Sequence, residues 1–268
     1  MRRTLLLFSA KLLLISACSN GQPGPASANT KCAGITGPFK TAQLKNERVK
    51  EAYDQKEGGL LKALNDKGIC PENLELYIRV FKADKKLEVW AKNKADSAFQ
   101  LFKVYDICQS SGTLGPKRKD GDKQVPEGFY HISDFNPASR FHLSLGINYP
   151  NKADLILGDE KPGNEIYIHG DCVTIGCMPL TDEIIKELYV LCVEAKTAGQ
   201  TNIPVHIFPS KLIAKADMAA VMPAVYKGHL PFWVSLKPAY DYFEKHKKLP
   251  AISIDSEGNY VVELKDKN

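Results

Sequence analysis

Residues 168–189 read IHGDCVTIGCMPLTDEIIKELY, a stretch that brings one histidine, two cysteines and two glycines close together. His169 ends an apolar run that is typical of a strand, and the pattern after Thr181 is typical of a helix. The loop between them carries Cys172 and Cys177. These residue types fit metal ligands, disulfide partners, or a nucleophile with its base, and each interpretation predicts a different protein.

The metal and disulfide interpretations both leave residues unexplained. His169, Cys172 and Cys177 are zinc ligands by type, but a structural zinc site needs four ligands, and this spacing matches no paired Cys-x-x-Cys arrangement. We therefore predict no metal and no cofactor. A disulfide would join Cys172 to Cys177 across a tight loop, or would use Cys192 on the apolar face of the following helix. Either pairing leaves His169 and the neighbouring glycines without a role.

The third interpretation is a nucleophilic thiol. A free thiol has a pKa of about 8.5, and a nearby histidine or a donor-rich backbone lowers that value. His169 ends its strand, so its ring can be held beside the loop that returns with Cys177. Gly176 permits a sharp turn, and the backbone N–H groups around it are where an oxyanion hole would form. We therefore predict a Cys177 nucleophile with His169 as its base.

The N-terminus, MRRTLLLFSAKLLLISACSN, has the layout of a secretory signal peptide. Its apolar stretch is well short of the ~20 residues that a spanning helix needs. The small residues before Cys18 resemble a bacterial lipobox, which predicts a signal peptide over residues 1–17 and a lipid on Cys18. An ordinary signal peptide or an uncleaved anchor is the alternative. Residues 18–40 are rich in Gly, Pro, Ser and Asn, and we predict a flexible tether there.

The cysteines and the charge restrict the environment and the partners. Seven cysteines in an exported chain suggest disulfides. If Cys18 is lipidated and Cys177 is the nucleophile, at least one of the remaining five is free: Cys32, Cys70, Cys108, Cys172 and Cys192. The formal net charge of +5 falls to +2 when the three cations of the signal leave. No basic-aromatic pattern accompanies that charge, so we expect no nucleic-acid partner.

The rest of the chain predicts an α+β fold around a mainly antiparallel sheet. Helices are predicted at residues 43–67, 182–198, near 211–226 and 237–247. Strands are predicted in a hairpin from Leu74 with a polar tip at 83–86, then at 98–108, 129–133, 140–147, 165–170 and 203–208, with a last hairpin turn at 256–259. Gly58-Gly59 is expected to break or kink the first helix. The long loop at 110–128 is either a mobile insertion or a rim over a site.

The central stretch carries a family resemblance. His169-Gly170, followed by Thr174-x-Gly176-Cys177, resembles the [ST]-x-G-C signature of the L,D-transpeptidase catalytic domain, or YkuD, family. The segments SGTLGPKRKDGDKQVPEGFYHI, NPASRFHLSLGINYPN and MPLTDEIIKELY are similar to its YafK-like branch. The resemblance implies a Cys177 nucleophile, a His169 general base and acid oriented by the Gly170 carbonyl, and oxyanion donors at the N–H groups of Gly176 and Cys177. Thr174 would brace the loop or contact substrate, or be a simple turn residue.

The resemblance also implies a domain plan and a substrate. It covers about residues 74–208, so we place a catalytic domain at 74–209, an N-terminal helical segment at 41–73, and C-terminal helices and a hairpin packed on that domain at 210–268. It implies a periplasmic enzyme acting on peptidoglycan stem peptides. With a lipid on Cys18, we expect an outer-membrane lipoprotein that contacts the membrane through this lipid alone.

Two departures from the family pattern leave the reaction open. Many members carry a histidine where this chain has Ile175, and an arginine or asparagine where it has Pro179. We predict a transpeptidase that works through a cysteine thioester. One alternative is a hydrolase, an amidase or L,D-carboxypeptidase, that releases a peptidoglycan-linked lipoprotein or a D-amino acid. Another is a non-catalytic lipoprotein that binds peptidoglycan.

Overall fold

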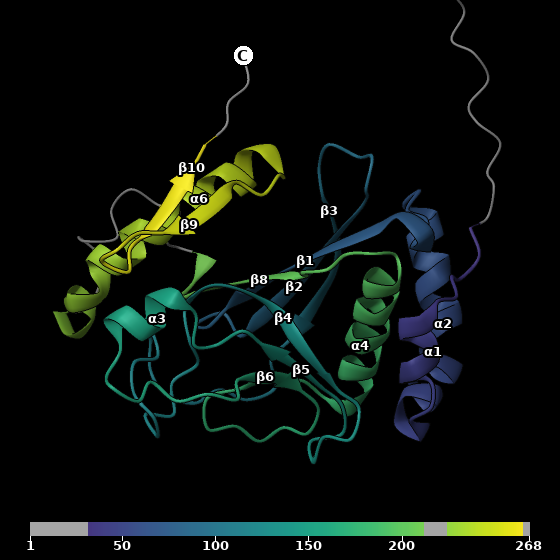
Figure 1. Ribbon diagram of the computed structural model, residues 1–268, viewed down its shortest axis with the longest axis horizontal. Helices are drawn as coiled ribbons and strands as arrows, with labels where there is room; N and C mark the ends of the chain where they lie inside the picture. Colours follow the sequence, from purple (N-terminus) through teal and green to yellow (C-terminus); the bar gives the residue numbers. More distant parts are fainter. Residues whose placement is uncertain (1–31, 212–223, 265–268) are drawn as a thin grey trace, which may run out of the picture. The chain divides into compact units, whose positions relative to one another are not determined.

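The alternating strand patterns form one eight-stranded sheet, shown in Figure 1, in the computed structural model. The structure describes residues 32–211 and 224–264. The order of strands across the sheet is β3-β2-β1-β8-β4-β5-β6-β7. The strands are β1 (Leu74–Phe81), β2 (Lys86–Asn93), β3 (Gln100–Asp106), β4 (Gly128–Asn136), β5 (Ser144–Ile147), β6 (Tyr167–His169), β7 (Met178–Pro179) and β8 (Pro204–Phe208).

Most neighbouring strands of this sheet are antiparallel. Only β1 with β8 and β6 with β7 are parallel among the pairs in the described residues. The predicted first hairpin forms as β1 and β2, with Phe81 opposite Lys86 at its turn. The predicted α+β class with a mainly antiparallel sheet is confirmed. The predicted signal peptide, Cys18 and most of the helix expected near 211–226 lie outside the described residues.

One face of the sheet is covered by α4 (Asp182–Thr197), and α2 (Glu47–Asp66) packs on α4 (Figure 1). The predicted break at Gly58-Gly59 is wrong, because α2 continues through both exposed glycines. Each glycine costs a helix about 1 kcal/mol relative to alanine. Burial of apolar side chains on both sides of the pair outweighs that cost, at Val49, Ala52, Tyr53, Leu60 and Leu64.

The N-terminal tether is shorter than predicted. Cys32 is disulfide-bonded to Cys70, and α1 (Pro38–Gln43) begins within the range expected to be flexible. Lys40 is buried and its ammonium forms ion pairs with Glu57 at 2.7 Å and Glu194 at 2.8 Å. The prediction of a flexible tether is therefore wrong for residues 32–40, since a covalent bond and a buried ion pair hold them against α2 and α4.

The opposite face of the sheet is covered by α6 (Leu230–His246), which begins seven residues before the predicted helix. Trp233 and Leu236 in its first turns are fully buried against Phe81 of β1. Pro238 interrupts the helical hydrogen bonding, but this burial holds the helix together across the proline. The last hairpin forms at the predicted turn, from β9 (Ala251–Ile254) and β10 (Tyr260–Glu263).

Two short helices, η1 (Pro71–Asn73) and α3 (Lys152–Leu157), and the two-residue strand β7 were not anticipated, and neither was α1. The 3-10 helix η3 (Ala224–His229) overlaps the end of the helix predicted near 211–226. The start of α3 has a capping box in which the side chains of Asn151 and Asp154 accept each other's backbone N–H groups. Among the described residues, no helix has both the length and the apolar character that crossing a bilayer requires.

Candidate active site

The pairing of β6 with β7 brings the predicted nucleophile and base to one face of the sheet. Ile168 lies beside Met178, and His169 lies beside Pro179, in parallel register. Cys177 immediately precedes β7, so it is the neighbour of Tyr167. Because side chains alternate between the faces of a strand, Tyr167, His169 and Cys177 share one face, and Ile168 and Met178 point to the core.

The imidazole of His169 is held in one orientation. Its side chain is 1% exposed, and Nδ1 lies 2.5 Å from the carbonyl oxygen of Gly170. A carbonyl can only accept, so Nδ1 carries the proton and Nε2 has the free lone pair. The ring of Phe141 lies against the imidazole, with 4.7 Å between the ring centroids. His169 is thus prepared to take a proton at Nε2.

Thr174 fastens the loop that carries the thiol. Its Oγ1 accepts the N–H of Cys177 at 2.8 Å and the N–H of Gly176 at 3.2 Å, and donates to the carbonyl of Cys177 at 2.8 Å. The bracing role predicted for Thr174 is what the structure contains. The two N–H groups predicted as oxyanion donors are already engaged by this hydroxyl, so a substrate oxyanion would have to replace it.

Glycine is favoured at two positions of the loop. Gly176 has φ +139°, and a Cβ there would lie 3.1 Å from the carbonyl oxygen of Gln124. A Cβ on Gly170 would lie 2.6 Å from Oδ1 of Asp182, the atom that accepts the N–H of Asp171. Any side chain at Gly176 would be strained by the positive φ and would push on the Gln124 carbonyl, and a side chain at Gly170 would displace the Asp182 carboxylate.

Two cavities meet at Cys177. The large cavity has a volume of 660 Å³, and its lining includes His169, Phe141, Arg140, Glu165 and Ile175. The small cavity has a volume of 290 Å³, and its lining includes Lys85, Ser111, Leu114, Met178 and Tyr226. Cys177 and Gln109 line both. The thiol is therefore accessible from two sides, and Gln109 lies where the cavities join.

The predicted loop at 110–128 forms a rim of the small cavity and is not a free insertion. The buried Lys82 ammonium donates to the carbonyls of Gly115 and Val125, at 2.7 Å each, and pairs with the buried Glu127 carboxylate at 3.1 Å. Glu127 also accepts the indole N–H of Trp233 at 2.6 Å. These contacts fix the loop between the sheet and α6, which confirms the interpretation of the loop as a rim.

The disulfides answer the question raised by the cysteine pattern. Cys108 is bonded to Cys172, and the thiols of Cys177 and the buried Cys192 are free. The alternative Cys172–Cys177 bridge is therefore excluded. Because its sulfur is in a disulfide, Cys172 cannot be one of the metal ligands considered above. Two bridges and a free Cys192 agree with the expectation that at least one of the remaining cysteines is unpaired.

Burial keeps both reacting groups neutral before substrate binds. It raises the pKa of the Cys177 thiol, and the N–H of Tyr167, which points to the sulfur, only partly opposes this effect. Burial lowers the pKa of His169, although its hydrogen bond to Gly170 acts in the opposite direction. The expected lowering of the thiol pKa by the histidine is wrong for this state, since desolvation dominates. The site holds a thiol next to a neutral base.

Sequence reasoning missed three residues of the site. Gln109, Phe141 and Tyr167 reach it from a loop after β3, the loop before β5, and β6. Tyr167 could have been found from strand alternation, because it lies two residues before His169. No local pattern marks Gln109 or Phe141, because their position depends on how distant segments pack.

The Cys108–Cys172 bridge is expected to matter for catalysis as well as for stability. It ties the loop between His169 and Cys177 to the segment that also donates the Cys108 N–H to the Pro179 carbonyl at 3.1 Å. Replacing both cysteines by serine should reduce turnover at least about tenfold, because small displacements of a reacting group are costly. Thermal unfolding and turnover measured on the same preparation check this result.

The second disulfide provides a matched control. The bridges span 64 and 38 residues, so loss of either removes about 4 kcal/mol of chain-entropy stabilisation. A Cys32→Ser/Cys70→Ser variant should lose comparable stability but keep its turnover while folded. Equal turnover in the two double variants would show that the Cys108–Cys172 bridge has no special role at the site.

Comparisons with known proteins agree with the motif. Residues 75–207 match the YkuD family, the L,D-transpeptidase catalytic domain. Over 189 residues the chain is 38% identical to the Escherichia coli K12 protein named "Putative L,D-transpeptidase YafK". The aligned residues make up 70% of this chain and 73% of that protein. The protein of the same name from Escherichia coli O157:H7 matches with the same identity and coverage.

Among solved structures, the helical cell shape determining protein Pgp2 from Campylobacter jejuni has a TM-score of 0.42 at 17% identity, covering 68% of this chain and 73% of that chain. Bdellovibrio bacteriovorus Bd1075 has a TM-score of 0.36 at 27% identity, covering 51% and 48%. The family resemblance predicted from the motif is confirmed by the sequence matches. The chain belongs to the YkuD family of L,D-transpeptidase catalytic domains.

Proposed function

We propose that this protein is a cysteine L,D-transpeptidase that acts on peptidoglycan stem peptides through a thioester on Cys177. The observation that carries the proposal is the free Cys177 thiol on the same face as the buried, oriented imidazole of His169, at the junction of two cavities. Family membership supports the substrate class, because this family acts on peptidoglycan stem peptides.

In the first half-reaction, Nε2 of His169 takes the proton of the Cys177 thiol as the sulfur attacks the substrate carbonyl. That carbonyl belongs to the L-centre of a diamino acid such as meso-diaminopimelate, linked to a D-amino acid or to a protein lysine. The C–N bond then breaks, and His169 gives the proton to the departing amine. A thioester with Cys177 and a free amine result.

In the second half-reaction, an amine attacks the thioester and His169 accepts its proton. The sulfur leaves as a thiolate and recovers that proton, so a new amide forms and the enzyme is regenerated. Two cavities at Cys177 suit this sequence, since one can hold the acyl part while the other admits the acceptor. Water in place of the amine would give the hydrolase, which uses the same thioester.

The oxyanion of each tetrahedral intermediate needs donors near Cys177. The N–H groups of Gly176 and Cys177 are the closest candidates, and a rotation of Thr174 about its side-chain bond would release them. We infer that substrate binding exchanges the Thr174 hydroxyl for the substrate oxygen. Each such donor contributes a few kcal/mol to transition-state stabilisation in other acyl-transfer enzymes.

We further infer that the protein works in the periplasm and is held at the outer membrane by a lipid on Cys18. The signal-like N-terminus supports this inference, and so do the two disulfides, which persist in oxidising compartments. Incorporation of labelled fatty acid into the wild type, and its absence in Cys18→Ala, tests the lipid. Equal labelling of both proteins would contradict it.

Incubation of the purified protein with sacculi, followed by analysis of the released muropeptides, tests the reaction. New cross-links between diamino acids are expected from a transpeptidase. Loss of D-amino acids or release of bound lipoprotein without new cross-links would instead identify a hydrolase. Binding to sacculi without any change in muropeptides would identify a non-catalytic peptidoglycan-binding protein and overturn the proposal.

A further inference from the structure

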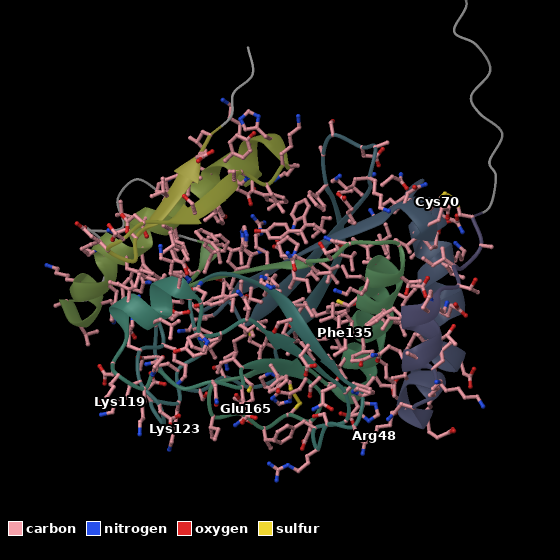
Figure 2. All side chains as sticks on the ribbon, viewed as in Figure 1. Arg48, Cys70, Lys119, Lys123, Phe135 and Glu165 are labelled. Carbon is pink, nitrogen blue, oxygen red and sulfur yellow. A yellow bond between two sulfur atoms is a disulfide. The ribbon has the colours of Figure 1, made fainter. Side chains whose placement is uncertain are left out.

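The first turn of α2 contacts a wall of the active site. Asn46 caps this helix by accepting the Arg48 N–H at 3.0 Å. The Arg48 guanidinium then donates from one nitrogen to two carbonyl oxygens, those of Ser139 and His142, the second at 2.7 Å. Figure 2 labels Arg48 and also Glu165, a residue that lines the large cavity. Arg48 lies outside residues 75–207, the segment that matches the family.

The segment that Arg48 holds, residues 137–143, is tightly folded and strained. Oγ of the buried Ser139 accepts the N–H of Phe141 at 3.0 Å and the hydroxyl of Ser144 at 2.5 Å. His142 has φ +66°, a conformation that non-glycine residues rarely adopt and that surrounding contacts must maintain. Arg48 supplies such a contact, because it binds the carbonyl of His142 itself.

The same segment supports His169 from two directions. The Phe141 ring covers one face of the imidazole at 4.7 Å between centroids. The carbonyl of Leu143 accepts the N–H of Gly170 at 3.1 Å, and Ser144 is the β-pair partner of His169. A displacement of residues 137–143 would therefore move the ring that shields the base and the backbone beside it.

The helix that carries Arg48 is itself firmly docked. Tyr53 of α2 donates to the buried Glu194 carboxylate of α4 at 2.8 Å, and Lys56 pairs with Glu183 of α4 at 2.6 Å. Lys186 of α4 pairs with Glu51 of α2 at 2.8 Å. These contacts fix α2 relative to α4, the helix that starts next to the catalytic loop. The position of Arg48 relative to that loop is therefore fixed as well.

We propose that Arg48 is a positioning residue. It clamps residues 137–143, so that Phe141 shields the imidazole of His169 from water and holds the ring in its orientation. The inference rests on the proposed function, because it assigns to His169 the role of a base. It makes the N-terminal helical segment a part of the catalytic machinery and not only a cover for α4.

The expected effect follows from burial of the base. Burial lowers the pKa of His169, so a loosened Phe141 that admits water should raise that pKa toward its ordinary value. The other titratable and charged groups that face this site remain in place in an Arg48 variant. They are Asp171 on the catalytic loop, Asp182 of α4, Arg140 and His142 on the clamped segment, Glu165 before β6, and Cys177.

The test compares Arg48→Gln with Lys62→Gln, a matched variant that removes another cation from α2, one that is exposed and pairs with Asp66 of the same helix. The pKa of His169 is read from its ring resonances in a pH titration by NMR. It should rise by roughly half a unit in Arg48→Gln and stay unchanged in Lys62→Gln. Muropeptide turnover should fall about fivefold in Arg48→Gln with little change in KM.

Two further variants define the outcome. Phe141→Leu should raise the pKa of His169 although Arg48 is present, and Arg48→Lys should restore part of the turnover. An unchanged His169 pKa in Arg48→Gln, or an equal shift in Lys62→Gln, would overturn the clamp. A shift confined to Arg48→Gln and Phe141→Leu in a protein without muropeptide activity would retain the clamp and reject the proposed function.

Discussion

Cys177→Ala is expected to lower muropeptide turnover at least about a thousandfold, because no thioester can form without the sulfur. The fold should survive the change. The side chain is only half-buried, and the hydrogen bond that its thiol donates is a long one, 3.7 Å, to the carbonyl of Glu165. Turnover and thermal unfolding of the same preparation measure the two effects separately.

Cys192→Ala is the matched control for the thiol. Cys192 lies on the buried face of α4 and is fully buried in the core, and burial raises the pKa of its thiol far above the ordinary value. This variant should lose stability by leaving a small cavity and should keep its turnover. If Cys177→Ala retained turnover, or if Cys192→Ala lost it while folded, Cys177 would not be the nucleophile.

His169→Gln is expected to lower turnover by roughly a hundredfold to ten-thousandfold, the range associated with loss of a general base. Glutamine can still hydrogen bond in the space of the ring, but it cannot take the thiol proton. His131→Gln is a suitable control, because His131 is on β4 and does not line either cavity at Cys177. Similar losses in the two variants would point to a structural role for His169.

The pH dependence of turnover should also identify His169 as the base. The base works as a neutral imidazole, and burial places its pKa below the ordinary value. Turnover should therefore persist into mildly acidic solution and decline only as the pH falls through that lowered pKa. His169→Gln should lack this acid limb, whereas His131→Gln should retain it. An acid limb unchanged in His169→Gln would assign the titration to another group.

Local patterns predicted much of this structure because they depend on neighbours in the chain. Strand alternation predicted β1, β2 and β3, and apolar periodicity predicted α4. The motif around Gly176 predicted which thiol and which imidazole would share a face. The short helix α3 also has a local signal, since Asn151 and Asp154 have the spacing of a capping box.

The remaining features depend on contacts between distant segments. The partner of Cys172 is 64 residues away, and nothing near either cysteine specifies it. The helix predicted at 237–247 left out the first seven residues of α6, where the burial of Trp233 decides the outcome. Phe141 reaches His169 only through the path of its loop. Contacts of this kind require knowledge of the tertiary packing, which local patterns do not contain.

Under the function and location proposed above, the bridge between Cys108 and Cys172 would also link catalytic competence to maturation. A newly made chain in a reducing cytosol would have an untethered catalytic loop and a poorly placed thiol. Only after translocation and oxidation would the loop acquire its working shape. An enzyme able to cut or join wall peptides would thus stay inert until it reached the compartment that contains them.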